Sequence, residues 1–183
     1  MKEESLIERQ LGSKLIFDGR ILHVYDDAVA LPDGKEASRE LIRHVGAVCV
    51  IPLTENGNVI VERQFRYPVG QVLTEIPAGK LDYAGEDPEE AARRELREET
   101  GYSAEEMIPM GVFYPAAAYS SEAIHMFLAR GLHKGVQDLD PGEFLVVQTV
   151  PLKELAAQVL AGEIPDIKTQ AAVLRAYLMT QNQ

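Results

Sequence analysis

The sequence has little cysteine and no long apolar run, and each shortage excludes a class of protein. Cys49 is the only cysteine, so one chain can form neither a disulfide framework nor a metal site of several thiolates. It lies in the apolar run GAVCVIPL, where we expect a core residue. No window approaches the roughly 18 uninterrupted apolar residues of a membrane-spanning helix. We therefore expect no segment that crosses a membrane.

Basic residues are also scarce, with 18 Lys and Arg against 29 Asp and Glu and a net charge of −11. This balance argues against broad binding to nucleic acid or to an anionic membrane. It suits a protein that handles cations, or an anionic substrate bridged by cations, and equally one whose acidity only aids solubility. The N-terminal MKEESLIERQ lacks the apolar stretch of a signal peptide, so we expect a cytoplasmic protein.

The expected elements are many strands, a helix, more strands and two final helices. Asp33-Gly34 and Asn56-Gly57 indicate tight turns between strands, and GAVCVIPL is typical of a strand buried on both faces. Further strands are expected up to Pro77 and in residues 110–114 and 123–132, and residues 136–150 are expected to be a loop that leads into a strand. Helices are expected in 88–100, 152–161 and from 166. This order predicts an α+β fold, an α-β-α sandwich with a mixed β-sheet between helices. Residues 1–45 are expected to form an N-terminal antiparallel β segment and residues 46–183 the main domain.

The segment PAGKLDYAGEDPEEAARRELREETGY contains eight acidic residues and strong helix signals. Asp87 can cap a helix, Pro88 suits the first helical position, and Glu90 can complete a capping box. Gly101 is a stop signal. The helix is therefore predicted from about Pro88 to Thr100.

A helical wheel at roughly 100° per residue gathers three glutamates on the same face as small apolar residues. The glutamates are Glu95, Glu98 and Glu99, and the apolar residues are Ala91, Ala92 and Leu96. The opposite face is expected to be solvated and carries Glu89, Arg93, Arg97 and Thr100.

Like charges one helical turn apart are destabilising, and partial burial makes the penalty larger. Arg94 can hold one carboxylate, that of Glu98, but it cannot neutralise three. Mg²⁺ or Mn²⁺ can, with water and substrate phosphates as the remaining ligands. The helix is therefore a candidate catalytic surface for phosphate chemistry. The alternative is that a Glu- and Arg-rich helix is only a solvated surface.

These residues resemble the Nudix box, the loop–helix signature of the Nudix hydrolases. The matching positions are Gly79, Glu86, Arg94-Glu95-Leu96, Glu98-Glu99, Gly101 and Tyr102, with one extra residue between Gly79 and Glu86. HVGAVCVIPL, VERQFRYPVG, TEIPAGKLD, FYPAAAYSSE and DPGEFLVV are similar, in this order, to the ADP-ribose pyrophosphatase branch. The resemblance covers about residues 15–175. It implies the Nudix fold and a homodimer whose N-terminal β segment reaches the partner.

The resemblance implies hydrolysis, with Mg²⁺ or Mn²⁺, of the pyrophosphate bond of ADP-ribose or a related nucleoside diphosphate sugar, giving AMP and ribose 5-phosphate. The implied metal ligands are Glu95, Glu99, the nearby Glu98, which we also assign a catalytic role, and the backbone carbonyl of Ala78. A general base is expected in the loop before the last strand. Glu143 is our choice, with Asp138 and Asp140 as competitors.

The residues expected to bind substrate are Arg66, Arg63 and Glu75. Arg66 resembles the arginine of this branch that reaches the substrate phosphates, although a cross-strand ion pair is an open alternative, and Glu75 is either a substrate-side or a structural carboxylate. Residues with structural roles in the motif are Gly79, Glu86, Arg94 and Gly101. Aromatic residues that either stack on a base or belong to the core are Phe17, Tyr25 and Tyr67. We assign no chemistry to the four histidines.

Ala117, in PAAAY, takes a place where the ADP-ribose branch usually carries a proline. The loop could therefore serve a different sugar or a wider range of substrates. A GDP-mannose-type or other sugar-nucleotide pyrophosphatase is one alternative function. A non-catalytic, ligand-sensing Nudix-like module is another, and a purely structural acidic domain would show no metal-dependent turnover.

Overall fold

The computed structural model describes residues 3–181. Residues 1–2 of the expected N-terminal segment and residues 182–183 of the expected main domain lie outside it. The N-terminal elements are η1 (Glu3–Leu6), β1 (Arg9–Asp18), β2 (His23–Ala30) and β3 (Glu36–Ile42). The following elements, up to the glutamate-rich helix, are β4 (Ala47–Pro52), β5 (Asn58–Arg66), η2 (Tyr67–Val69), β6 (Gln71–Glu75), β7 (Ala78–Lys80) and α1 (Pro88–Thr100). The last are β8 (Tyr102–Phe113), β9 (Ile124–Lys134), β10 (Leu145–Pro151), α2 (Leu152–Leu160) and α3 (Ile167–Gln181).

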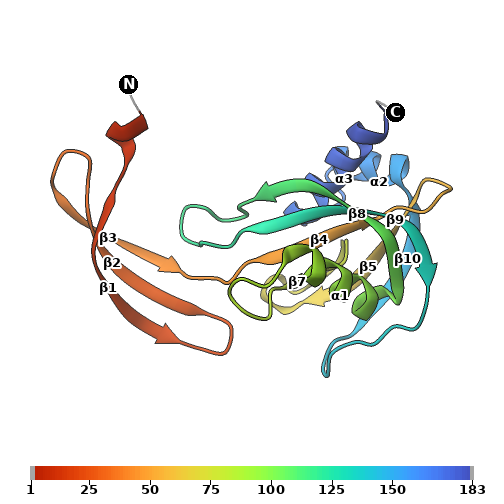
Figure 1. Ribbon diagram of the computed structural model, residues 1–183, viewed down its shortest axis with the longest axis horizontal. Coiled ribbons are helices and arrows are strands. Elements are labelled where there is room, and N and C mark those ends of the chain that lie inside the picture. Colours follow the sequence, from red (N-terminus) through yellow and green to blue (C-terminus); the bar gives the residue numbers. More distant parts are fainter. Residues whose placement is uncertain (1–2, 182–183) are drawn as a thin grey trace.

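The central sheet has the strand order β7-β4-β9-β8, with β4 and β9 parallel and the other pairs antiparallel. Every residue of β4 is buried. Because side chains alternate along a strand, Val48 and Val50 pack with α1, whereas Cys49 and Ile51 pack with α2 and α3. Figure 1 shows the helices on opposite sides of this sheet. The predicted mixed sheet between helices is confirmed, and Cys49 is a core residue.

A second, antiparallel sheet has the order β10-β5-β6. Strand alternation places Glu62 and Arg66 on one face of β5 and Arg63 and Phe65 on the other. Glu62 is paired in register with Glu75 of β6. One face of this sheet therefore presents an acid and a cation, whereas the other combines a cation with an aromatic side chain.

The N-terminal sheet, β1-β2-β3, is antiparallel, as predicted, and stands to one side of the rest of the chain (Figure 1). Every residue of β1 is exposed in the single chain, including Leu11, Leu15 and Phe17. The Ile42 N–H, at the end of β3, donates to the Tyr119 carbonyl across 2.8 Å. The exposure of β1 means that no other part of the chain covers these large apolar side chains.

Helix α1 has the predicted bounds and caps. A carboxylate oxygen of Asp87 accepts from the N–H groups of Glu89 and Glu90, at 2.8 and 3.2 Å. Gly101 ends the helix with φ 75°, in the left-handed region that favours glycine. Its N–H donates to the Arg97 carbonyl. The end of the helix then leads directly into β8, which begins at Tyr102.

The predicted solvated face of α1 is wrong at Thr100, which is buried. Its hydroxyl donates to the Leu96 carbonyl at 2.5 Å. Arg93 is half-buried and donates to the Ala104 carbonyl at 2.8 Å. The reason is that β8 packs along this side of the helix, which a helical wheel cannot reveal.

Two strands also differ from the prediction. The strand expected near residues 110–114 begins at Tyr102, because the Gly101 cap turns the chain straight into pairing with β9. The strand expected to end at Pro77 is β6, which ends at Glu75, and β7 then pairs separately with β4. This division matters because β7 carries Ala78 and Gly79.

Of the helices between residues 3 and 181, none has the length and apolar content that crossing a membrane requires.

Candidate active site

A cavity of about 530 Å³ lies between α1, β7 and the loop before β10. It brings together most of the predicted site residues. The predicted residues among its lining are Arg66, Ala78, Gly79, Arg94, Glu95, Glu98, Glu99, Asp140 and Glu143, and the others are Ile21, His44, Lys80 and Asp82. The sequence motif and the loop before the last strand therefore meet at one site.

Strand β7 lies so close to α1 that a side chain at position 79 would displace the Glu95 carboxylate. A Cβ added to Gly79 would lie 2.0 Å from the carboxyl carbon of Glu95. One turn further along the helix, the Ala78 N–H donates to the Glu99 carboxylate at 2.8 Å. Two glutamates of the helix thus hold their carboxylates against the β7 backbone.

Arg94 is the cation at the centre of this face. Its guanidinium contacts the Glu95 carboxylate at 2.6 Å and that of Glu98 at 3.3 Å. It also lies 3.5 Å from the carboxylates of Asp82 and Glu86. The predicted Arg94–Glu98 pair is present, and Glu86 is an ion-pair partner of the motif. One arginine serves four carboxylates.

The burial of the glutamates appears in their proton affinities. Burial raises the pKa of Glu95 to about 7, although the Arg94 charge opposes the shift. Burial also raises the pKa of Glu99, and the neighbouring Glu62 charge adds to that shift. These oxygen donors are the ligands that Mg²⁺ and Mn²⁺ prefer. The site therefore has the donor chemistry of a hard divalent cation.

Two of the glutamates have partners within the protein. Glu95 is bonded to Arg94 and Glu99 to the Ala78 N–H. In residues 3–181, no group of three or more His, Cys, Asp or Glu side chains is arranged so that it could hold a metal ion. Cation binding requires these carboxylates to exchange their present partners for the ion.

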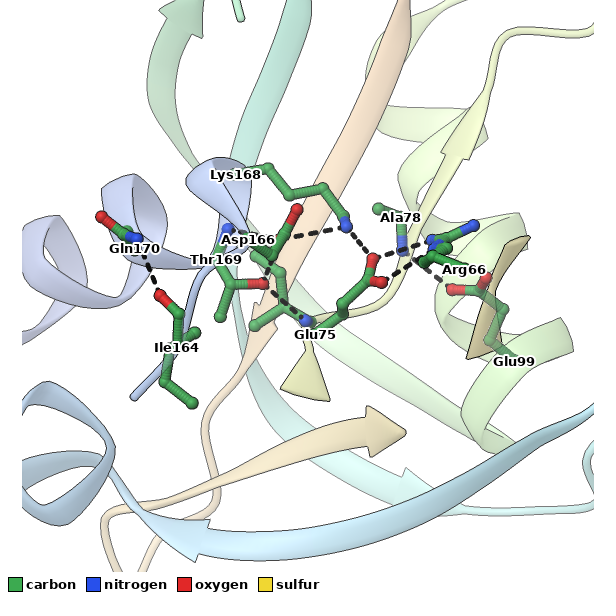
Figure 2. A network of polar contacts seen from close by, with 10 residues as sticks. Arg66, Glu75, Ala78, Glu99, Ile164, Asp166, Lys168, Thr169 and Gln170 are labelled. Carbon is green, nitrogen blue, oxygen red and sulfur yellow. Dashed lines mark hydrogen bonds and ion pairs between the residues drawn. The ribbon is translucent and has the colours of Figure 1, made fainter. Parts of the chain in front are cut away.

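Glu75 lies behind the cavity between two cations (Figure 2). Its two carboxylate oxygens accept from Arg66 Nε and Nη2, at 2.7 and 2.8 Å. Lys168 Nζ, from α3, also bonds to it. Burial raises the pKa of Glu75, but the Arg66 hydrogen bond and the Lys168 charge outweigh it and lower the pKa overall. Glu75 is thus paired with two cations, and the cross-strand ion pair considered for Arg66 is present.

The beginning of α3 is fastened to the strand segment before the motif. The Asp166 carboxylate accepts from the Thr169 N–H and hydroxyl at 2.9 and 2.6 Å, and from Lys168 at 3.1 Å. The Ile76 N–H donates to the Thr169 hydroxyl at 3.1 Å (Figure 2). The C-terminal helix therefore helps to fix the position of Arg66 through Lys168 and Glu75.

Lys168 and His44 are site residues that the sequence did not reveal. Both line a hollow of about 240 Å³ that shares Arg66 with the main cavity. The Gly46 N–H donates to His44 Nδ1 at 3.1 Å, so the ring proton of a neutral His44 lies on Nε2. Neither residue belongs to a recognisable spacing. Only the fold brings them to the motif.

Other predicted residues lie elsewhere. Arg63 lines a separate hollow with Phe65, because strand alternation turns it away from Arg66. Asp138 is outside the cavity lining, and its N–H donates to the Glu98 carbonyl at 3.0 Å. Among the candidates for the general base, Asp140 and Glu143 thus remain beside the glutamates.

The three aromatic candidates do not line the cavity in the described part of the chain. Phe17 and Tyr67 are 56% and 87% exposed, so the expectation that they belong to the core is wrong for both. Tyr25 lies under the Arg43 guanidinium, 4.0 Å from the ring centroid. Ala117 is exposed in the turn between β8 and β9.

Replacing Gly79 by alanine tests the contact between β7 and α1. The new methyl group would meet the flexible end of Glu95, so we expect Gly79→Ala to fold but to lose about 100-fold in any metal-dependent hydrolysis, as a misplaced reacting group does. Mn²⁺ titration and circular dichroism would measure both effects. Lys153→Ala is the control, because Lys153 is an exposed residue of α2 outside the cavity lining. Full activity of Gly79→Ala would contradict the role of this contact.

The raised pKa values predict a pH dependence of stability. Glu95 and Glu99 bind protons more tightly in the folded chain than in the unfolded one, so the folded chain holds more protons near neutral pH. The free energy of unfolding of the metal-free protein should therefore fall as pH rises from 4.5, the ordinary value, through about 7 and beyond. Chemical denaturation at several pH values measures this slope. Glu95→Gln should flatten it, whereas exposed Glu55→Gln should not, and an unchanged slope in Glu95→Gln would contradict the assignment.

The comparisons with known proteins agree with this geometry. A family profile described as the NUDIX domain matches residues 43–171, and one described as the nucleoside diphosphate sugar hydrolase N-terminal domain matches residues 8–42. The chain is 40% identical over 172 residues to the ADP-ribose pyrophosphatase of Bacillus subtilis (strain 168), covering 93% of this chain and 92% of that protein. It is 39% identical over 168 residues to the methanol dehydrogenase activator of Bacillus methanolicus, covering 91% and 90%.

A solved structure titled "Crystal structure of ADP compounds hydrolase" superimposes with a TM-score of 0.84 and covers 96% of this chain and 95% of that one. At 22% sequence identity this likeness shows the shared fold. The NUDIX domain profile covers most of the chain and contains the whole glutamate helix. The protein therefore belongs to the Nudix family and is a Nudix pyrophosphohydrolase, one of a class of enzymes that generally need divalent metal ions.

Proposed function

We propose that this enzyme uses Mg²⁺ or Mn²⁺ to hydrolyse the pyrophosphate bond of ADP-ribose, giving AMP and ribose 5-phosphate. The observation that carries the proposal is the cavity whose lining combines Arg66 with the motif glutamates. A group of carboxylates that can bind cations and an arginine that can bind an anion, in one cavity, suit a diphosphate bridged by metal ions. The 40% identity to an ADP-ribose pyrophosphatase over nearly the whole chain supports ADP-ribose as the substrate.

Different residues of the cavity lining have different roles in the proposed reaction. Glu95, Glu98, Glu99 and the Ala78 carbonyl would hold the cations. When bound, divalent ions neutralise the diphosphate charge and lower the pKa of the attacking water. Arg66 remains 39% exposed although Glu75 holds it. The N–H groups that do not bond to Glu75 can therefore donate to a phosphate. Water forms the new P–O bond while the bridging P–O bond breaks.

Glu143 is the proposed general base. It lines the cavity together with Glu95 and Glu99, and its charge contributes to the raised pKa values of both. Its N–H donates to the Asp140 carbonyl at 3.0 Å, which fixes the turn that carries it. Asp140 shares the cavity and is the remaining competitor. A carboxylate on this loop can take the proton of the attacking water, while the helix glutamates hold the cations.

A substrate panel tests the proposed function. The purified protein is incubated with Mg²⁺ or Mn²⁺ and ADP-ribose, GDP-mannose, FAD, NADH or diadenosine polyphosphates, and the products are identified by chromatography. We expect ADP-ribose to be cleaved with the highest kcat/KM. Preference for GDP-mannose would support the alternative sugar-nucleotide pyrophosphatase, to which the Ala117 loop is relevant. No cleavage of any compound would refute the proposal.

Glu99→Gln tests whether the helix glutamates carry the activity. Removing a proposed metal ligand should lower kcat/KM by about 1000-fold, roughly 4 kcal/mol of transition-state stabilisation. Folding should be little affected, because the change removes one charge from a repulsive cluster. Glu106→Gln, an exposed position on β8, is the matched control for the loss of one charge. Unchanged turnover in Glu99→Gln would contradict the site.

A homodimer is part of the proposal. The N-terminal sheet exposes Leu11, Leu15 and Phe17, and the outer face of the β10-β5-β6 sheet has a hollow of about 650 Å³ lined by Phe65 and other apolar side chains. Exposed apolar areas of this kind mark interaction surfaces. A second copy that places its N-terminal segment against this face would cover both. Residues 1–45 are thus the proposed dimerisation segment and 46–183 the hydrolase domain, in a protein that we predict to be cytoplasmic.

Light scattering coupled to size-exclusion chromatography tests the dimer. We expect a mass of about twice the 20.2 kDa of one chain. Leu15→Glu should shift it toward the monomer without destabilising the single chain, because Leu15 is already 46% exposed there. Leu160→Glu, at the exposed end of α2, should remain dimeric. A monomeric wild-type protein would overturn this part of the proposal.

A further inference from the structure

Glu62 is a buried acid that the site described so far leaves unused. It lies in β5 and is 0% exposed. Neither of its carboxylate oxygens has a hydrogen-bond partner among residues 3–181. Burying an ionised carboxylate without a partner is strongly unfavourable. A group in this position needs either a proton or a cation.

Its surroundings place Glu62 against the motif glutamates. It shares a face of β5 with Arg66 and stands opposite Glu75 in register. Arg66 also lines the cavity together with Glu99, so this face of β5 is turned toward the motif helix. The charge of Glu62 adds to the raised pKa of Glu99, which is consistent with this placement.

The cations of the protein close to Glu62 are bonded to other acids. Arg66 donates to both oxygens of Glu75, and Lys168 donates to Glu75 and Asp166. Their charges favour an ionised Glu62, whereas burial and the Glu75 charge oppose it and raise its pKa overall. Neither cation is hydrogen-bonded to Glu62, so both of its oxygens are left without a partner among residues 3–181.

We propose that Glu62 is a sheet-borne carboxylate of the divalent-cation site, where it holds an ion together with Glu99. The proposal rests on the metal dependence in the proposed function, and it adds a residue outside the motif helix. An ion shared by β5 and α1 would satisfy the two unpartnered oxygens of Glu62. It would also tie the helix to the sheet that carries Arg66. Hard oxygen donors from both sides suit Mg²⁺ or Mn²⁺.

Metal binding by the intact protein tests this role directly. Metal-free wild type, Glu62→Gln and Glu62→Val are titrated with Mn²⁺ by calorimetry, and bound Mn²⁺ is counted by electron paramagnetic resonance. We expect both variants to lose about 10- to 100-fold in affinity, the range for residues that support a metal site, or to lose one bound ion. The valine variant keeps the test open if glutamine prevents folding, because valine suits a buried strand.

Thermal unfolding provides a second readout that a merely structural residue would not give. Without metal, both variants should have a higher Tm than wild type, because an unpaired buried acid is gone. The increase in Tm on adding Mn²⁺ should be smaller in the variants, since a ligand stabilises by its affinity for the folded state. Glu106→Gln should match wild type in both measurements.

Wild-type Mn²⁺ affinity and stoichiometry in Glu62→Gln and Glu62→Val would overturn the inference, with Glu62 then a protonated acid that only packs. That result leaves the proposed function standing if wild type still cleaves ADP-ribose. Conversely, Glu62-dependent Mn²⁺ binding by a wild-type protein that cleaves no nucleotide diphosphate would refute the proposed function and retain the cation site. Turnover of wild type is therefore measured on the same preparation.

Discussion

The site is organised by an excess of buried negative charge over the cations that the chain places beside it. Arg94 is shared by four acids, of which Glu98 is also 3.6 Å from Arg97, while Arg66 and Lys168 are both held by Glu75. Like charges at this spacing oppose helix formation. The helix forms nevertheless, because its caps and its fully buried apolar residues offset the repulsion. Those apolar residues are Ala91, Ala92 and Leu96. A ligand that binds only the folded chain then recovers stability in proportion to its affinity.

The scaffold makes this crowding possible by fixing each charged group from a different element. Both faces of β4 are packed, one against α1 and the other against α2 and α3, so the sheet cannot shift to relieve the repulsion. Gly79 lets β7 approach the Glu95 carboxylate. On the other side, Thr169 and Asp166 fasten α3 to Ile76. The elements that carry the acids are therefore fixed before any cation arrives, and only the carboxylates must exchange partners, which lowers the ordering cost of binding.

The parts of this fold that sequence predicts well are those decided locally. The bounds of α1 follow from Asp87, Pro88 and Gly101, and the turns at Gly34 and Gly57 follow from residues that tolerate positive φ. The motif also identifies the glutamates that line the cavity, and the strand order predicts a mixed sheet. In each case the signal lies within a few residues of the structure that it specifies.

The parts that sequence misses depend on contacts between distant segments. Lys168 lies 93 residues from Glu75, so nothing near TEIPAG indicates that this acid has two cationic partners. Thr100 falls on the polar side of the helical wheel, yet β8 covers it. The wheel gives directions around the axis and contains no information about what packs there. Arg63 is near Arg66 in sequence and is expected with it at the substrate site. Strand alternation instead places the two arginines in different hollows.

Glu62 shows the same limit most clearly. In NVIVERQFR, a charged residue after three apolar ones is compatible with the end of a buried run or with a solvated face. The structure buries it completely, on a strand that β6 and β10 flank on both sides. A hydrophobic residue there would pack without electrostatic cost. A local choice that opposes stability and has no compensating protein contact is expected at functional sites. The unpartnered oxygens of Glu62 are therefore better explained by an ion shared with Glu99 than by packing.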